Sequence, residues 1–331
     1  MAEVEEKVSP WASVKVMLAI VGMILVPAGL ALHTVQVAPV IPMADGTWAG
    51  LTPYGYTISL LLFLVPIVVI GLWILPKDGV RVSQRSFAWT VGLMFPLGAA
   101  LDFFFAHRFF IFPNAGATLR ILAPALGGGV PVEEYVFYLT GFMAVLLIYI
   151  WLDEYWLTAY SVPVDSKTRM DFERLLRFHA PSLVFAVVLI AGAIVYRRVF
   201  VSAEGFPGYF VFLVVTALGP SAALFPTALP VVNWRAFGLT SVVVLLISLL
   251  WEATLALPYG WWGFQDGAMI GIYVTAWSRL PIEEVVLWVG VTYATVMVYE
   301  IVRRWKASGK GLRHAFLGAA RTAGRGSAAR P

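Results

Sequence analysis

The chain has 331 residues, of which 60% are hydrophobic and 13% charged, and its mean hydropathy of +0.83 is typical of a polytopic membrane protein. It contains no cysteine, which excludes disulfides, thiolate metal sites and thiol catalysis. The net charge of +4 comes mostly from a basic tail after Ile301, which is more typical of a cytoplasmic membrane surface than of nucleic-acid binding.

Eight windows of about 20 apolar residues, the length that crosses a bilayer as a helix, follow one another along the chain. They are residues 13–33, 53–75, 86–107, 131–151, 181–200, 208–229, 236–257 and 281–302. The acidic start MAEVEEKVSP lacks the basic segment of a cleavable signal, so we expect the first window to be a retained membrane helix. With the N-terminus inside, 18 of the 23 Lys and Arg residues fall on the inner side, as the positive-inside rule expects. The sequence predicts an all-α protein of about eight transmembrane helices in the cell membrane, with both termini cytoplasmic.

The segments between the windows differ in kind. Residues 152–180 form the largest inner loop, and its stretch DSKTRMDFERLLRF predicts a short interfacial helix in a cytoplasmic linker. The outer loops 108–130 and 258–280 are rich in glycine and aromatic residues, and we expect them to dip into the interface or cover a cavity. Residues 303–331 are predicted to be a basic, disordered cytoplasmic tail.

One motif occurs twice, as PVEEYVFYL at 131–139 and PIEEVVLWV at 281–289. An ungapped shift of 150 positions also pairs Arg85 with Arg235, Phe87 with Phe237, Thr90 with Thr240, Asp102 with Glu252, Ala144 with Ala294 and Tyr149 with Tyr299. A constant offset through two helices and a loop predicts internal duplication. Residues 1–151 would hold spans one to four and residues 181–302 spans five to eight, as two parallel four-helix repeats about an axis along the membrane normal.

The acids that lie within or beside the spans, away from the cytoplasmic helix ends, all belong to this duplicated part. They are Asp102, Glu133, Glu134, Glu252, Glu283 and Glu284. A glutamate pair behind a proline is also what a plain helix start at the interface contains, but two copies, each with a third acid at similar depth, favour a functional cluster. The bases nearby are few, namely His107, Arg108, Arg120 and Arg279. We therefore expect at least one carboxyl to stay protonated, which makes it a candidate general acid.

Aromatic residues are frequent around these acids. The candidates for contact with a substrate are Phe105, Phe137, Tyr138, Trp251 and Trp288. Their ring faces can stabilise a cation, although an interfacial aromatic belt and ordinary helix packing would use the same residues.

Several classes of membrane enzyme lack support. There is no DDxxD-like run for a prenyl diphosphate, no lysine within 281–302 for a retinal Schiff base, and no group of intramembrane histidines for a metal oxidase. No glycine-rich fingerprint indicates a nucleotide or redox cofactor. Two classes remain: a cofactor-free acid/base enzyme acting on a membrane-dissolved hydrocarbon, and a proton-coupled transporter that uses the same acids as a relay.

Duplicated PxEE motifs, each heading a membrane helix, resemble the membrane-integral carotenoid cyclases, which occur as two small subunits or as one fused chain. The resemblance covers most of residues 50–302 and depends mainly on PVEE and PIEE. It implies an intramolecular lyase or isomerase of the lycopene β-cyclase type that needs no cofactor and no metal. The implied partners are lycopene or a related polyene, the lipid bilayer and neighbouring enzymes of carotenoid biosynthesis, with no nucleic acid.

The implied reaction protonates the acyclic ψ end group, closes a six-membered ring through a tertiary cation and ends with loss of a proton. We expect Glu133, Glu134, Glu283 and Glu284 to form the acid/base set, and Asp102 and Glu252 to tune it or relay protons. An adjacent carboxyl, or else Arg120 or Arg279, would activate the acid through a hydrogen bond. The sequence leaves open the ring type, reaction at one or both ends, the length of the carotenoid, which glutamate is the acid, and the oligomeric state.

Overall fold

The computed structural model describes residues 52–77, 82–163, 179, 181–312 and 315. Within these residues, seven helices are long and apolar enough to cross a membrane. They are Gly55–Lys77, Gln84–Phe109, Val132–Trp156, Pro181–Phe200, Gly208–Ala228, Trp234–Ala256 and Ile282–Ser308. These correspond to the second to eighth predicted spans, so the described part of the chain is mostly helical and compatible with a polytopic membrane protein. The first predicted span, 13–33, and the interfacial helix predicted within 165–178 lie outside the described residues.

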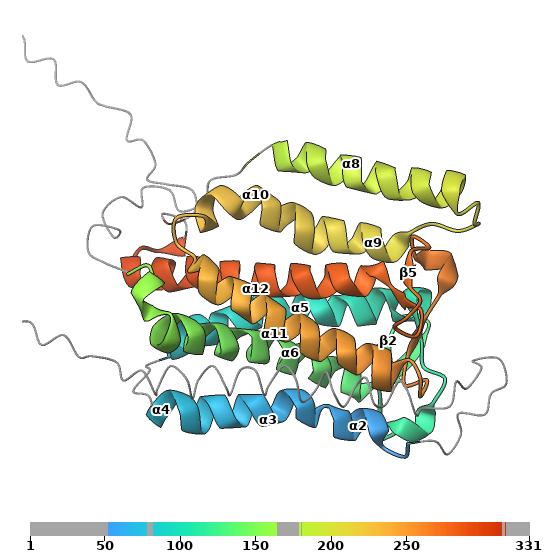
Figure 1. The fold of residues 1–331 in the computed structure, drawn as a ribbon, viewed down its shortest axis with the longest axis horizontal. Coiled ribbons are helices and arrows are strands. Elements are labelled where there is room, and N and C mark those ends of the chain that lie inside the picture. Colours follow the sequence, from blue (N-terminus) through green and yellow to red (C-terminus); the bar gives the residue numbers. More distant parts are fainter. Residues whose placement is uncertain (1–51, 78–81, 164–178, 180, 313–314, 316–331) are drawn as a thin grey trace, which may run out of the picture.

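The elements are numbered in chain order, and Figure 1 labels most of the helices and two of the strands. The α-helices are α2 (Gly55–Ser59), α3 (Leu61–Val69), α4 (Leu75–Lys77), α5 (Gln84–Phe109), α6 (Val132–Trp151), α8 (Pro181–Val195), α9 (Gly208–Leu213), α10 (Gly219–Ala228), α11 (Trp234–Trp251) and α12 (Ile282–Ser308). The π-helical turns are Ile70–Ile74, Leu152–Trp156, Tyr196–Phe200, Val214–Leu218 and Glu252–Ala256, and the short 3-10 turns are Ala115–Ala117, Thr158–Tyr160 and Asp266–Ala268. The strands are β1 (Phe110–Ile111), β2 (Leu122–Ala125), β3 (Gly128–Pro131), β4 (Gly263–Phe264), β5 (Tyr273–Val274) and β6 (Leu280–Pro281).

Helices α6 and α12 form the centre of the bundle (Figure 1). Helix α12 packs against α5, α6, α10 and α11, and α6 packs in addition against α3 and α5. The apolar stretch of the α6 span is 72% buried, whereas that of the α8 span is only 11% buried. Helix α8 lies on the outside, where most of its valine side chains are exposed and suit contact with lipid. Acids at the first turns of α6 and α12 are therefore enclosed by other helices.

The loop end of the bundle consists of residues 110–131, which join α5 to α6, and residues 257–281, which join α11 to α12. Each loop contains a 3-10 turn followed by a two-stranded antiparallel sheet, β2 with β3 and β5 with β6. Strands β1 and β4 pair the two loops with each other, with Phe110 opposite Phe264. These strands depart from the predicted all-α fold. A loop covering an apolar bundle must pair its backbone groups, and a chain bent by glycine and proline does so as short hairpins.

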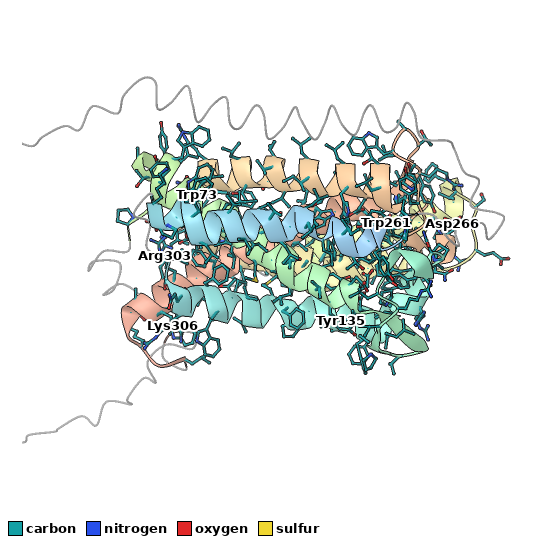
Figure 2. All side chains as sticks on the ribbon, turned by 90° about the horizontal axis from the view of Figure 1, so that it is seen from below. Trp73, Tyr135, Trp261, Asp266, Arg303 and Lys306 are labelled. Atoms are coloured by element: carbon teal, nitrogen blue, oxygen red, sulfur yellow. The ribbon has the colours of Figure 1, made fainter. Side chains whose placement is uncertain are left out.

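The opposite end, here called the charged end, consists of Asp153, Glu154, Glu300, Arg303 and Arg304. Arg303 pairs with Asp153 at 3.3 Å and with Glu154, and the buried Arg304 pairs with the buried Glu300. Tyr149 also donates a hydrogen bond to Glu300 at 3.0 Å. Arg303 and Trp261 mark the two ends of the bundle in Figure 2.

These ion pairs change one predicted boundary. Helix α12 continues to Ser308, beyond the predicted end at residue 302. Arg303 and Arg304 were assigned to a cytoplasmic tail, but their carboxylate partners keep them in the helix. A buried guanidinium is tolerated there because it is paired and hydrogen-bonded.

We expect Arg304→Ala to lower the free energy of unfolding by about 3 to 5 kcal/mol, because it leaves the Glu300 carboxylate buried without its closest cation. Thermal unfolding of the detergent-solubilised protein, followed by tryptophan fluorescence, measures the change. Lys77→Ala is the matched control, because Lys77 is an exposed cation at the end of another membrane helix. Equal melting temperatures for the two variants would contradict a structural role for the Arg304–Glu300 pair.

Candidate functional site

The two PxEE motifs form the same local structure. Pro131 and Pro281 each end a strand and occupy the position before the first turn of α6 or α12. Proline suits a helix start because its missing N–H would have no helical partner there. The glutamates that follow are all buried, with side chains in the first turn of each helix, where free backbone N–H groups favour acids.

The first glutamate of each motif holds the loop that precedes it. Glu133 Oε1 accepts hydrogen bonds from the Leu119 amide at 2.7 Å and from the Thr57 hydroxyl at 2.5 Å. Glu283 Oε1 accepts from the Ile270 amide at 2.6 Å. Since Leu119 and Ile270 follow the 3-10 turns of the two loops, these bonds fix the loops over the ends of α6 and α12.

The second glutamate of each motif faces the centre of the bundle. Glu134 and Glu284, together with Glu252 from the first π-helical turn after α11, line one cavity of about 30 Å³, here called the central cavity. The rest of its wall consists of Tyr56, Phe110, Phe112, Phe137, Tyr138, Tyr209, Trp262 and Leu287. The cavity has room for about one or two water-sized groups. Three carboxyl groups from two parts of the chain that are far apart in sequence therefore meet in one aromatic enclosure.

Neutral donors hold these acids. Tyr56 donates to Glu134 at 2.9 Å and Trp288 donates to Glu252 at 2.7 Å. Asp102 lies behind the cavity wall, where it accepts a hydrogen bond from Tyr138 at 3.3 Å. Glu134 lies within electrostatic range of Asp102 and Glu284, and Glu284 within range of Glu252, so that the four acids form one cluster.

No ion pair neutralises the cluster among the described residues, where every salt bridge involves Arg303 or Arg304 at the charged end. The expectation that Arg120 or Arg279 activates an acid is not met. Both side chains are exposed, and the Arg279 guanidinium lies 5.0 Å from the centre of the Tyr273 ring. Arg120 and Arg279 lie in loops and turn outward, where solvent or lipid headgroups can surround their charges. The side chains that donate hydrogen bonds to the acid cluster are therefore aromatic.

Sequence reasoning missed a buried arginine near the second motif. Arg197 is 3% exposed and donates hydrogen bonds to the carbonyl groups of Glu204 and Met269. The positive charge of Arg197 also acts on the Glu283 carboxyl. Glu283 Oε1 in turn accepts the hydrogen bond from the amide of Ile270, the residue after Met269. Arg197 thus stabilises the loop around residue 269 and does not line the central cavity.

The predicted substrate contacts divide into three groups. Phe137 and Tyr138 line the central cavity. Trp288 reaches it through the hydrogen bond to Glu252, and Trp251 supports it from behind, with its ring 5.3 Å from that of Phe137. Phe105 is not among the lining residues.

Phe105 instead stacks on Phe109 at 5.5 Å and contacts Phe212, on another face of α5. The lining residues that the prediction lacked include Tyr56 and Tyr209. No motif marks either tyrosine, because tertiary packing alone brings α2 and α9 to the acids.

Other sites offer less. A cavity of about 400 Å³ lies between α8, α10 and α12, and it has no carboxylate in its wall. No group of three or more His, Asp or Glu side chains in the described ranges is arranged to hold a metal ion. The acid cluster is therefore the candidate functional site.

Comparison of the chain with protein-family models, with curated proteins and with solved structures found no match. The functional argument therefore depends on the chemistry of the acid cluster and of the cavity it lines.

We expect Glu133→Ala to destabilise the protein by about 1 to 3 kcal/mol, because it leaves a buried amide and a buried hydroxyl without their acceptor. Glu133→Gln keeps an acceptor oxygen in the same place and should cost less. Thermal unfolding and the hydrogen-exchange rate of the Leu119 amide are the measurements. Faster exchange in the alanine variant alone is expected, and equal rates in all three proteins would contradict the role assigned to Glu133.

Proposed function

We propose that this protein is a membrane acid/base isomerase that closes the ψ end group of an acyclic carotenoid such as lycopene into a ring. One observation carries the proposal: three carboxyl groups line a single cavity with aromatic walls, inside helices that are apolar enough to cross a membrane. The apolar surroundings suit a hydrocarbon substrate, and the acids supply the only chemistry that such an isomerisation needs.

The reaction balances without a redox partner. A carboxylic acid adds its proton to the terminal double bond of the end group, which leaves a tertiary carbocation. The nearby double bond attacks this cation, a carbon–carbon bond closes the six-membered ring, and the charge moves to a ring carbon. A carboxylate then removes a proton from the ring, so that one proton is gained and one is lost.

The hydrogen bonds suggest which group begins as the acid. An O–H or N–H donor favours the carboxylate form of its acceptor, and Glu134 and Glu252 each have such a donor. Glu284 has the Tyr209 hydroxyl as a neighbour and shares a hydrogen bond with the Glu252 carboxyl, and two carboxyl groups can share a hydrogen bond only if one of them is protonated. In this proposal Glu284 holds the proton at the start, and Glu134 or Glu252 accepts the proton that leaves the ring.

The cation intermediate needs stabilisation and protection from water. Tyr56, Phe137 and Trp262 line the central cavity, and the faces of aromatic rings attract positive charge. The carboxylates add a larger electrostatic contribution in this low-dielectric setting. The loops held by Glu133 and Glu283 cover the cavity, which limits the water that could capture the cation.

The duplicated architecture belongs to the same proposal. The bonds from Leu119 to Glu133 and from Ile270 to Glu283 are equivalent at a shift of 150 or 151 positions, and they support two related halves. With the predicted span 13–33 the chain would have eight transmembrane helices in two parallel four-helix repeats, with both termini in the cytoplasm. The central cavity then lies where the halves meet, as sites in repeat membrane proteins often do.

The direct test is expression in a lycopene-accumulating bacterium followed by pigment analysis. We expect lycopene to be converted into a cyclic isomer of the same mass. In a reaction run in D2O with purified protein in vesicles, the product should gain one deuterium per ring, because the added proton comes from an acid that exchanges with solvent. Unchanged lycopene would overturn the proposal, and proton flux across proteoliposomes without any cyclic product would favour the transporter.

The second test separates the two glutamates of each motif. Glu134→Gln and Glu284→Gln remove carboxyls that line the central cavity, and we expect each to lower the rate of product formation by about 10² to 10⁴-fold. Glu133→Gln is the matched neighbour on the same turn, and it should retain far more activity because its role is to hold a loop. Equal losses in all three would contradict this division of roles.

A further inference from the structure

Three small cavities follow one another along α6. The central cavity shares Phe137, Tyr138 and Leu287 with a second cavity of about 20 Å³, here called the middle cavity. The middle cavity shares Gly141 and Trp288 with a third, also of about 20 Å³, here called the lateral cavity. Shared walls place the three in a row that begins at the acids.

The far end of this row reaches an exposed face of the described helices. The lateral cavity lies between α3, α6 and α11, and Leu62 of α3 lines it while being 44% exposed. Its lining extends down α6 to Ile148, which is 14 residues from Glu134. At a rise of 1.5 Å per residue, the row covers about 21 Å along the helix.

The shape and polarity of the row suit a thin apolar chain. Tyr138, Trp288 and Ser248 carry the polar groups of the middle and lateral cavities, and the first two use theirs on Asp102 and Glu252. A file of water across the bundle would need more partners than the Ser248 hydroxyl supplies. A linear hydrocarbon needs none.

Gly141 stands at the junction of the middle and lateral cavities. A Cβ atom added there would meet only the Trp288 ring, at 4.0 Å, so the space beside Gly141 is not filled by packing. The contrast is Gly98 on α5, where an added Cβ would lie 2.7 Å from the Tyr138 ring and helix contact itself demands glycine.

The Trp288 indole separates the row into its parts. It stacks on Phe63 with centroids 6.2 Å apart, meets Phe137 edge-on at 5.5 Å, and donates to Glu252. If the indole turns, the middle and lateral cavities join, and Glu252 loses its hydrogen bond at the same time. Opening of the row is thereby coupled to the basicity of a carboxylate in the central cavity.

From this arrangement we infer that the row is the binding path for the linear polyene chain of the substrate. The end group of the substrate lies at the acids, and its chain passes beside Gly141. Trp288 is the gate of the path. The identity of the chain rests on the proposed function. The path itself rests on the shared cavity walls and on the opening beside Leu62.

The test uses the absence of native cysteine, since one introduced thiol is then a unique label site. Leu62→Cys places a thiol at the mouth of the row, and Leu72→Cys, an exposed position in the same membrane helix, is the control. Each variant is reconstituted in phosphatidylcholine vesicles and labelled with a membrane-permeant maleimide, with and without lycopene. At a lycopene concentration of about four times the dissociation constant, labelling of Leu62→Cys should slow about fivefold, and labelling of Leu72→Cys should not change.

Gly141→Leu in the Leu62→Cys background blocks the path and should abolish this protection. Gly92→Leu is its control, because an added Cβ at Gly92 meets nothing within 4 Å. Protection that persists in Gly141→Leu, or equal protection of Leu72→Cys, would overturn the path. Protection without any cyclic product would support the path and contradict the cyclase activity. Product formed at an undiminished rate by Gly141→Leu would contradict the path and support the cyclase activity.

Discussion

The constraint that shapes this bundle is the burial of four carboxyl groups, those of Asp102, Glu134, Glu252 and Glu284, with no salt bridge to a cation among the described residues. In apolar surroundings an unpaired carboxylate is costly, and like charges close together add to that cost. Neutral hydrogen-bond donors offset part of this cost, namely the hydroxyls of Tyr56 and Tyr138 and the indole N–H of Trp288. Glu134 and Glu284 are also stabilised by their positions in the first turns of α6 and α12. A bundle selected for stability alone would place apolar side chains here, so the acids indicate a function that needs them.

At a shift of 150 positions, the two ends of the bundle differ in the charges that they bring together. At the charged end, Asp153 and Glu154 in the first half correspond to Arg303 and Arg304 in the second, at a shift of 150 positions. Opposite charges at such positions attract, and Arg303 does pair with both acids. At the other end Glu134 corresponds to Glu284, and like charges at equivalent positions repel. Ion pairs stabilise the charged end, whereas no such pairing among the described residues explains the acid cluster.

The sequence predicted the seven described spans closely because hydropathy reports burial in lipid, and it predicted the buried acids because a proline followed by glutamates is a strong helix-start signal. It could not tell Glu133 from Glu134. Adjacent helical residues point about 100° apart, and only packing decides which one meets a loop amide and which one meets the cavity. The hairpins at the loop end and the contribution of Tyr56 escaped prediction for the same reason, since both come from contacts distant in sequence.

The size of the central cavity bears on how such a site would work. A volume of about 30 Å³ cannot hold a six-membered ring, so the enclosure would have to open around its acids to admit one. A closed cavity keeps water from carboxyl groups that have no cation, and it would protect a carbocation once formed.

Opening must then be brought about by the ligand, and a ligand can shift a conformation only by binding the open form more tightly. A long apolar chain can do this, because each segment that leaves lipid for a row of protein cavities adds contacts along α6. A small hydrophilic solute has no comparable surface with which to displace Trp288, and for this reason the geometry favours a hydrocarbon over a solute carried through water.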